Sequence, residues 1–265
     1  MKLRIPFIKN PPLVSVVRLA GAIGMAGRGS LSDLALAPLL EKAFKRGKPD
    51  MVAIEINSPG GSPVQSSLIA ARIRRLSEET SVPVTAFVED VAASGGYWLA
   101  ASADEIWADD SSVVGSIGVI SSGFGAHVFL ARQGIERRVY TAGTSKSMLD
   151  PFRPENEQDV ARLKVILGDI HDNFIGYVKD RRGDKLDRTK DLFNGEIWLA
   201  RRATSLGLID GVGHLKPKMQ ARFGEKVQFR RYGIRRPFLS RIGAQVVDDA
   251  CVGLEERAAF ARFGL

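Results

Sequence analysis

The sequence has few of the residues that usually build cross-linked or histidine-dependent sites. Its 265 residues include one cysteine, Cys251, and three histidines. A single cysteine excludes a disulfide within the chain, which fits a reducing compartment. His171 falls in the middle of a predicted long helix, and His127 and His214 have no obvious acidic partner in the sequence. A Ser-His-Asp triad is therefore not supported.

Long apolar segments are also missing. Residues 1–12 are polar and contain proline, so they lack the apolar core of a signal peptide. No stretch reaches the roughly 20 apolar residues that are needed to span a bilayer. These absences predict a cytoplasmic protein, with peripheral contact at a membrane surface left open.

Positive charge is in excess, with a net charge of +8. Most basic residues are scattered over predicted helix faces, and five arginines are concentrated in residues 230–241. No nucleic-acid-binding motif accompanies them, so we expect no binding of DNA or RNA. A solvated arm or a contact between subunits best explains the arginine-rich segment, and contact with an anionic membrane surface is the alternative.

Strand and helix patterns alternate along the chain. We predict strands at residues 13–19, 51–56, 82–88, 105–108, 113–120 and 137–141. We predict helices after Ser32, at residues 62–76, from Ser94, and at residues 124–133, 155–181 and 199–206. This alternation predicts an α/β fold with a mainly parallel sheet. The predicted domain covers residues 13–233, between an N-terminal extension (1–12) and a C-terminal helical arm (234–265).

Ser94 is the most informative residue of the chain. It lies between the predicted strand 82–88 and a helix, in residues 91–98, Val-Ala-Ala-Ser-Gly-Gly-Tyr-Trp. Serine at such a junction often caps the helix. A cap does not require Gly95 and Gly96, which are poor helix formers and would allow a substrate backbone to approach. The segment therefore favours a nucleophilic serine over a simple cap.

A glycine-rich turn follows the predicted strand 51–56. Residues 57–62 read Asn-Ser-Pro-Gly-Gly-Ser and lead into a helix. A tight turn with a helix cap at Ser62 is one interpretation. The other is an oxyanion hole, because glycines at a helix N-terminus can point backbone N–H groups at a ligand. A phosphate-binding loop is disfavoured, since neither of its glycine spacings is present.

Without a histidine, the base that activates Ser94 has to be another residue. A lysine can act as the base if burial lowers its pKa by about 3 units. Most lysines of the chain lie on charged helix faces, whereas Lys146 is surrounded by small hydroxylated residues and followed by an apolar run. The residues alone leave open whether Lys146 is this base or an exposed loop lysine.

Five motifs in order resemble the signal peptide peptidase A family, whose members are Ser/Lys serine peptidases with a Clp protease/crotonase-like fold. The resemblance covers residues 14–213 and rests on residues 57–61 (Asn-Ser-Pro-Gly-Gly), 93–98 (Ala-Ser-Gly-Gly-Tyr-Trp), 115–119 (Gly-Ser-Ile-Gly-Val), 146–152 around the lysine, and the pair 195–198 (Gly-Glu-Ile-Trp) and 207–210 (Gly-Leu-Ile-Asp). It implies a repeated ββα superhelix with a mainly parallel sheet.

The resemblance also implies a site and a reaction. Ser94 would be the nucleophile and Lys146 the general base of an endopeptidase that works through an acyl-enzyme, with no metal or cofactor. Gly60 and Gly61 would form the oxyanion hole, and Ser116 would orient the lysine. Substrates would be extended peptides with small or apolar side chains, such as signal-peptide remnants or membrane-protein fragments, and Gly95 and Ser58 are candidates for lining their groove. Relatives of this length combine serine and lysine from neighbouring subunits, so we expect a homo-oligomer.

Two other classes remain open at this point. A crotonase-like acyl-CoA enzyme would share the glycine-rich oxyanion loop but would not require Ser94 or Lys146. A non-catalytic scaffold would bind peptides or membrane proteins through the same groove.

Overall fold

The computed structural model describes residues 11–24, 31–143, 145–233, 257 and 260–264. Most of the predicted N-terminal extension and C-terminal arm, together with Cys251 and with Arg235, Arg236 and Arg241, lies outside the described residues. The chain divides into two compact units. The first contains the residues up to Ile117 and from Gly176 onward, and the second is Gly118–Ile175. The predicted domain limits stay predictions.

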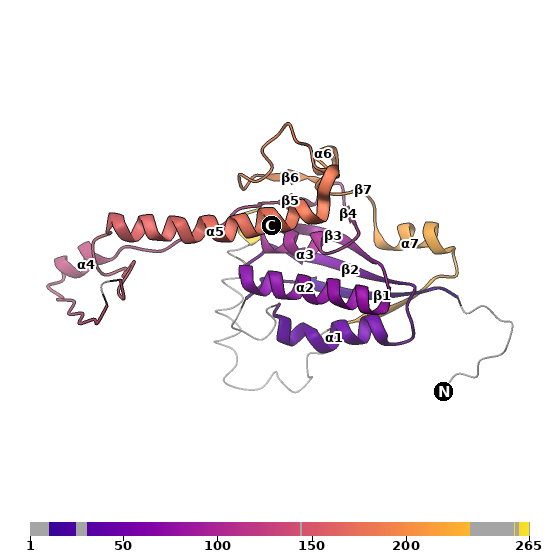
Figure 1. The fold of residues 1–265 in the computed structure, drawn as a ribbon, viewed down its shortest axis with the longest axis horizontal. Coiled ribbons are helices and arrows are strands. Elements are labelled where there is room, and N and C mark those ends of the chain that lie inside the picture. Colours follow the sequence, from indigo (N-terminus) through magenta and orange to yellow (C-terminus); the bar gives the residue numbers. More distant parts are fainter. Residues whose placement is uncertain (1–10, 25–30, 144, 234–256, 258–259, 265) are drawn as a thin grey trace. The chain divides into compact units, whose positions relative to one another are not determined.

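The first unit is built on an eight-stranded sheet (Figure 1). Its order is β6-β5-β3-β2-β1-β8, and β4 joins β3 to β7 beside this path. Every pair is parallel except β5 with β6. The strands are β1 (Leu13–Ala20), β2 (Met51–Ser58), β3 (Val84–Ala93), β4 (Glu105–Ala108), β5 (Val113–Gly115), β6 (Ile197–Leu199), β7 (Gly211–Val212) and β8 (Gln228–Tyr232). The predicted α/β class with a mainly parallel sheet is confirmed.

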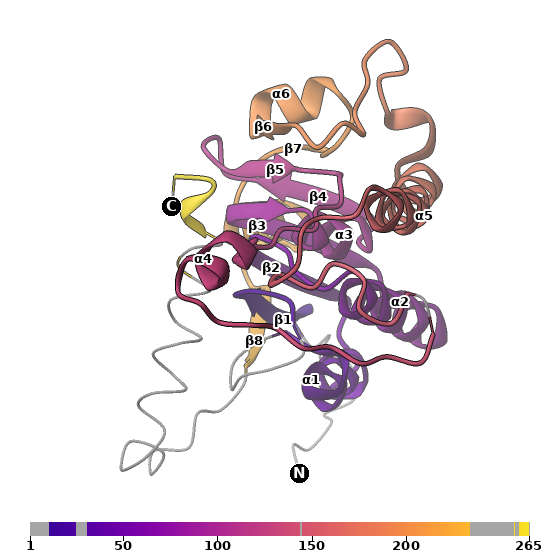
Figure 2. The ribbon, with the colours of Figure 1, turned by 90° about the vertical axis from the view of Figure 1, so that its left-hand side faces the viewer.

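Helices α1 (Asp33–Lys45), α2 (Pro63–Thr80) and α3 (Gly95–Ala101) lie together along the sheet (Figures 1 and 2). Ser32 caps α1 by accepting the Ala35 N–H at 3.4 Å, and Ser62 caps α2 by accepting the Gln65 N–H at 3.4 Å. Side-chain caps of this kind satisfy backbone donors that a helix start leaves unpaired.

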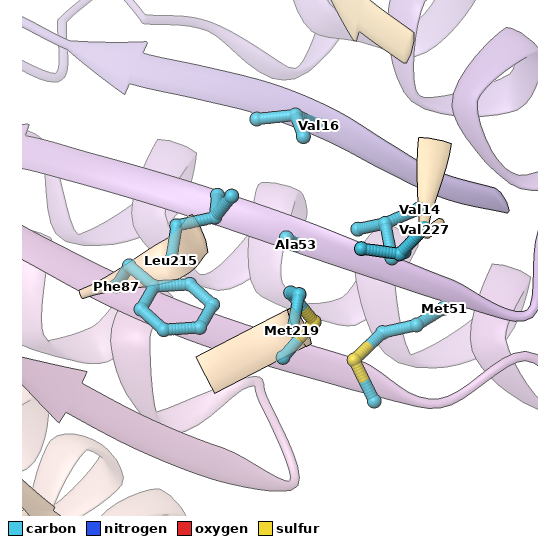
Figure 3. Packing of buried hydrophobic residues seen from close by; sticks show 8 residues of the cluster. All are labelled: Val14, Val16, Met51, Ala53, Phe87, Leu215, Met219 and Val227. Carbon is cyan, nitrogen blue, oxygen red and sulfur yellow. The ribbon is translucent and has the colours of Figure 1, made fainter. Parts of the chain in front are cut away.

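Helix α7 (Leu215–Phe223) packs against side chains of β1, β2 and β3 that all point to one face of the sheet. Leu215 and Met219 bury the side chains of β1, β2 and β3 shown in Figure 3: Val14, Val16, Met51, Ala53 and Phe87. Successive strand residues point to opposite faces, so the fully buried Val52, Ile54 and Ile56 face the other side. The central strands are thus buried on both faces, as expected for a parallel sheet.

The second unit contains α4 (His127–Arg132), the Lys146 turn and the first part of α5 (Glu157–Arg182). The strand predicted at residues 137–141 is wrong, because these residues have no regular structure. Its side chains are mostly exposed, with Tyr140 90% exposed, and Arg137 pairs with Asp150. β-Branched and aromatic residues such as Val139, Tyr140 and Thr141 do not form a strand where no neighbouring strand accepts their backbone hydrogen bonds.

Three strands, β6, β7 and β8, have no counterpart among the predicted ones. β7 has only two residues, and β8 has a basic sequence, Gln-Phe-Arg-Arg-Tyr, with mostly exposed side chains. β8 is the outer partner of β1. Charged residues are typical of an edge strand, and they hide the apolar alternation that would predict it.

Candidate active site

Ser94 lies in a sharp turn between β3 and α3. Its backbone has φ 53° and ψ −122°, a conformation that is rare for a residue with a side chain and costs roughly 1–3 kcal/mol. The Ser94 N–H donates to Gly115 O at 2.8 Å, and its carbonyl accepts the Trp98 N–H at 3.0 Å. The Ser94 hydroxyl makes no capping hydrogen bond to α3. Its side chain is therefore presented by the turn rather than used as a helix cap.

The glycine turn after β2 touches Ser94 directly. A Cβ on Gly60 would lie 2.8 Å from Ser94 Cβ, from Ala93 O and from Gly95 N. Gly60 has φ +100° and Gly61 has φ +143°, values that residues with a side chain rarely adopt. Both positions therefore require glycine for two reasons: there is no room for a Cβ, and the backbone conformation is unfavourable for other residues. The two motifs that the sequence placed 34 residues apart, at Gly60 and Ser94, are thus neighbours in space.

Backbone hydrogen bonds hold this loop in place. The Ile23 N–H donates to Gly60 O at 2.8 Å, and the Ser62 N–H donates to Ile23 O at 2.7 Å. The Gly60 N–H donates to the hydroxyl of the fully buried Ser58 at 3.2 Å. Within the described part of the chain, the Gly61 N–H has no hydrogen-bond acceptor, so it is the free donor of the loop.

Small residues allow α3 to start close to β2. A Cβ on Gly96 would lie 2.3 Å from Ser58 O, and one on Gly95 would lie 2.3 Å from Ser66 Oγ. Gly95 is buried, and no acceptor for its N–H occurs among the described residues. Gly95 N is also close to Gly60, so its N–H is a second free donor beside Ser94.

The turn after β5 joins Ser116 to the same place. Gly115 supplies the acceptor for the Ser94 N–H, and the next residue, Ser116, is half-buried with φ 51°. The Ser116 N–H donates to Glu196 O at 2.7 Å, and a Cβ on Gly115 would lie 2.7 Å from the Trp198 ring. The Gly-Glu-Ile-Trp motif therefore supports the turn that holds Ser94.

The Gly-Leu-Ile-Asp motif is a structural anchor. The buried Tyr97 hydroxyl donates to Leu208 O at 2.7 Å, and burial raises its pKa well above the ordinary value. Asp210 accepts hydrogen bonds from the Arg182 guanidinium at 2.8 Å, from Lys185 at 2.7 Å and from the Ile106 N–H at 2.8 Å. Burial by itself would raise the pKa of Asp210, but these hydrogen bonds outweigh it and hold the pKa below its usual range.

Lys146 lies in a turn of the second unit. Its side chain is exposed, and its N–H donates to Gly143 O at 3.2 Å. Asp150 closes the turn by accepting the Phe152 N–H at 3.0 Å and the Arg137 guanidinium at 2.8 Å. The Arg137 hydrogen bond holds the pKa of Asp150 below its usual range. The turn is ordered by Asp150, while Lys146 itself stays accessible within one chain.

Most exposed large apolar side chains of the described chain belong to this second unit. They are Ile120, Phe124, Val128, Phe129, Ile135, Tyr140, Leu149, Phe152, Val165 and Ile166. Phe124 is 92% exposed. Exposed apolar groups in such number are typical of a surface that a partner covers.

His214 has the acidic partner that the sequence did not reveal. Its Nε2 lies 2.8 Å from Asp109 Oδ2, and this hydrogen bond holds the pKa of Asp109 below its usual range. The partner is 105 residues away in the sequence, which is why no local pattern predicts it. The Asp109 N–H bonds Val88 O, six residues before Ser94, and strands rise about 3.3 Å per residue. The pair is therefore well removed from Ser94 along β3.

The described residues contain neither a metal-binding cluster nor a membrane-spanning helix. Among them, no group of three or more histidine, cysteine, aspartate or glutamate side chains is arranged to hold a metal ion. None of the described helices is both long and apolar enough to cross a membrane.

These features define an α/β protein that presents a serine hydroxyl at a strand-to-helix turn beside a glycine loop, an arrangement typical of serine hydrolases. The model of peptidase family S49 matches residues 77–226, more than half of the chain. The chain belongs to this family of serine peptidases, which includes the signal peptide peptidase A proteins.

Curated relatives agree over most of the chain. It is 30% identical over 175 residues to a putative signal peptide peptidase SppA of Enterococcus faecium, covering 66% of this chain and 51% of that protein. It is 28% identical over 202 residues to a probable protease SohB of Haemophilus influenzae, covering 76% and 56%. It is 47% identical over 271 residues to a Brucella abortus protein named Na(+)/H(+) antiporter NhaA, covering 95% of this chain but 37% of that protein. The chain thus spans between about a third and just over half of these relatives.

Solved structures confirm the fold. A variant of the 1510-N membrane-bound stomatin-specific protease, in complex with a substrate peptide, superposes with a TM-score of 0.54 at 14% identity. The match covers 92% of this chain and 98% of that one. The predicted Clp protease/crotonase-like fold class is confirmed.

Proposed function

We propose that the protein is an endopeptidase in which Ser94 attacks the peptide carbonyl and forms an acyl-enzyme. The observation that carries this proposal is the strained Ser94 turn held against the Gly60 loop. A backbone conformation of this cost persists where the surrounding structure fixes it, and such residues cluster at active sites. Membership of peptidase family S49 supports the same reaction.

The oxyanion of the tetrahedral intermediate needs N–H donors beside the nucleophile. Gly60 and Gly61 form the wall of this hole, as the motif predicts. Because the Gly60 N–H is held by Ser58, we propose the Gly61 and Gly95 N–H groups as the donors. Each such donor contributes about 3 kcal/mol to catalysis in other hydrolases. Ser58 would then hold the Gly60 N–H of the oxyanion loop rather than line the substrate groove. Gly95 would both donate to the oxyanion and line the substrate groove.

Lys146 is the proposed general base. In neutral form it would take the Ser94 proton and return it to the leaving amine, after which water would release the acyl group. Ser116, next to the residue that holds the Ser94 N–H, is the proposed partner that orients the lysine amine. A lysine base needs desolvation, and Lys146 is exposed within one chain. Burial of the exposed apolar side chains of the second unit by a neighbouring subunit would supply it.

We therefore propose a homo-oligomer in which Lys146 of one subunit serves Ser94 of another. The substrates would be extended peptides with small or apolar side chains, as in fragments of hydrophobic segments. A glycine-walled approach to Ser94 suits such peptides, because it leaves room for their backbone.

A fluorophosphonate probe tests the nucleophile. The assembled protein should be labelled at Ser94, and Ser94→Ala should abolish both labelling and peptidase activity. Absence of labelling in the assembled wild type would favour the non-catalytic scaffold. A Ser94→Ala variant that still turned over acyl-CoA thioesters would favour a crotonase-like enzyme.

Subunit mixing tests the shared site. Ser94→Ala and Lys146→Ala chains are each expected to be inactive, and equal amounts mixed at random should leave about one site in four intact. Mass spectrometry of differently labelled chains would verify that subunits exchange. No recovery of activity after verified exchange would place both residues in the same chain or remove Lys146 from the reaction.

A further inference from the structure

Strand β3 changes its neighbour shortly before it delivers Ser94. Residues Thr85–Val88 pair with β4, whereas Val91–Ala93 pair with β5. On the other side, β2 pairs Ile56 with Val88 and then Ser58 with Ala92. Three residues of β3, numbers 89–91, therefore lie opposite the single residue Asn57, which makes a β-bulge.

The bulge decides where both halves of the proposed site end up. On β3, the two residues that follow it, Ala92 and Ala93, lead into Ser94. On β2, Asn57 is three residues before Gly60 and ends the ladder with β1, since the Gly21 N–H donates to its carbonyl at 2.9 Å. A shift of this bulge would move the nucleophile and the oxyanion loop relative to each other. Bulges next to active sites commonly re-aim side chains in this way.

One side-chain hydrogen bond joins the two strands across the bulge. Asn57 Nδ2 donates to Asp90 Oδ2 at 2.5 Å. A second contact fixes the backbone, because the buried Ser112 hydroxyl donates to Glu89 O, a carbonyl that the bulge removes from the ladder. Of the two, only the Asp90 contact reaches the strand that carries the oxyanion loop.

We infer that Asp90 is a positioning residue that acts through Asn57 to fix the oxyanion loop against Ser94. The effect of Asp90 on catalysis rests on the proposed function, whereas its effect on the position of the loop does not depend on that function. A hydrogen bond to a carboxylate is roughly twice as strong as one between neutral groups, so Asp90 holds Asn57 better than a neutral residue would. A misplacement of about 1 Å at a reacting group can cost about a hundredfold in rate.

A competing explanation is that Asp90 acts only through its charge. Asp90 lines a pocket together with Glu55, Glu89 and Asp109, so its removal also changes the local potential. Asp109 provides the matched control, because it lines the same pocket but bonds His214 and the Ser111 N–H instead of Asn57. Asp109→Asn removes one negative charge and leaves the Asn57 contact intact.

Steady-state kinetics on an unstructured peptide is the first measurement. Asp90→Ala should lower kcat by about ten- to a hundredfold with little change in KM, because the lost geometry matters at the transition state. Asp90→Asn keeps an oxygen that can accept the Asn57 hydrogen, so it should stay within about threefold of wild type. Asp109→Asn should match wild type. Equal losses in Asp90→Asn and Asp109→Asn would show a charge effect and overturn the inference.

A double-mutant cycle tests whether Asp90 acts through Asn57. Asn57→Ala should reproduce the loss of Asp90→Ala, and the double variant should be no worse than the more affected single variant. Multiplied losses in the double variant would mean that the two residues act independently, which contradicts the inference.

Amide hydrogen exchange separates this inference from the proposed peptidase activity. In Asp90→Ala, but not in Asp109→Asn, the N–H groups of Gly60 and Ser62 should exchange at least about tenfold faster, because their loop is released. Unchanged exchange in Asp90→Ala would overturn the inference even if activity fell. The wild type could also fail to be labelled at Ser94 and fail to cleave peptides, which would refute the proposed peptidase activity. Faster exchange in Asp90→Ala would in that case still support the positioning role of Asp90.

Discussion

The Ser94 turn and the Lys146 turn are built in different ways. Ser94 has a costly backbone conformation, and its own chain surrounds it with the Gly60 loop, the Gly115 carbonyl and the start of α3. Lys146 is an exposed residue of a turn that Asp150 orders. One folded chain therefore completes the surroundings of the proposed nucleophile but leaves the proposed base exposed to solvent. The difference suggests that assembly, rather than folding, switches the site on.

The largest effect should come from replacing the two residues by glycine. Ser94→Gly should lower activity by at least about a thousandfold. It should also raise the free energy of unfolding by about 1 kcal/mol, because relief of the strained φ exceeds the entropic cost of glycine. Lys146→Gly should be equally inactive without any gain in stability. Urea unfolding of the two variants beside wild type measures this, and equal stability of both would show that the Ser94 turn is not strained.

A smaller effect on activity should follow when side chains are added to the glycine loop. Gly60→Ala and Gly61→Ala should each lower kcat/KM by about a hundredfold. The methyl group at position 60 would lie 2.8 Å from Ser94 Cβ, and the one at position 61 would lie 1.9 Å from Ile23 O. Gly123 in the second unit has nothing within 4 Å of a new Cβ. Gly123→Ala should thus keep full activity in the same assay. Tolerance of alanine at both residues of the loop would contradict its proposed role.

The two units should also differ in how much a single ion pair contributes to stability. Asp210→Ala leaves Arg182, which is 3% exposed, without its carboxylate and should cost about 3–5 kcal/mol of unfolding free energy. Glu136→Ala removes an exposed pair with Arg138 in the second unit and should change stability by less than about 0.5 kcal/mol. Chemical denaturation of both variants makes the comparison. Similar losses would mean that the second unit depends on its surface charges.

Low pH should lower the free energy of unfolding of the first unit, because it protonates carboxylates that are paired with arginine. Hydrogen bonds from Arg72 hold the pKa of Asp33 below its ordinary value. Hydrogen bonds from Arg182 and Lys185 likewise hold the pKa of Asp210 below its ordinary value. Below the ordinary carboxyl pKa the unfolded chain takes up these protons first, so stability should fall as pH drops from about 4 through the lowered values. Above that range both residues are ionised in either state and their contribution is complete. Asp33→Asn should flatten the pH dependence of urea unfolding, and an unchanged slope would exclude Asp33 from it.

Much of the fold follows from local sequence. The caps at Ser32 and Ser62, the apolar stripe of α1 and the strands β1 to β4 were predictable, because each depends on residues close together in the chain. The turn at Ser94 and the glycine loop were predictable for the same reason. The failed strand at 137–141 and the missed β8 depend on what lies beside them, and a neighbour in space leaves no local pattern.

The sequence by itself determined the α/β class, the nucleophile candidate and the glycines that such a turn needs, since backbone conformation is a local property. Only the tertiary structure decided which groups meet: Gly60 with Ser94, Asn57 with Asp90 across the bulge, and Asp109 with His214. Those contacts join residues 33 to 105 positions apart. They form because the sheet brings distant strand ends to one place, and no pattern within a single strand or helix encodes that.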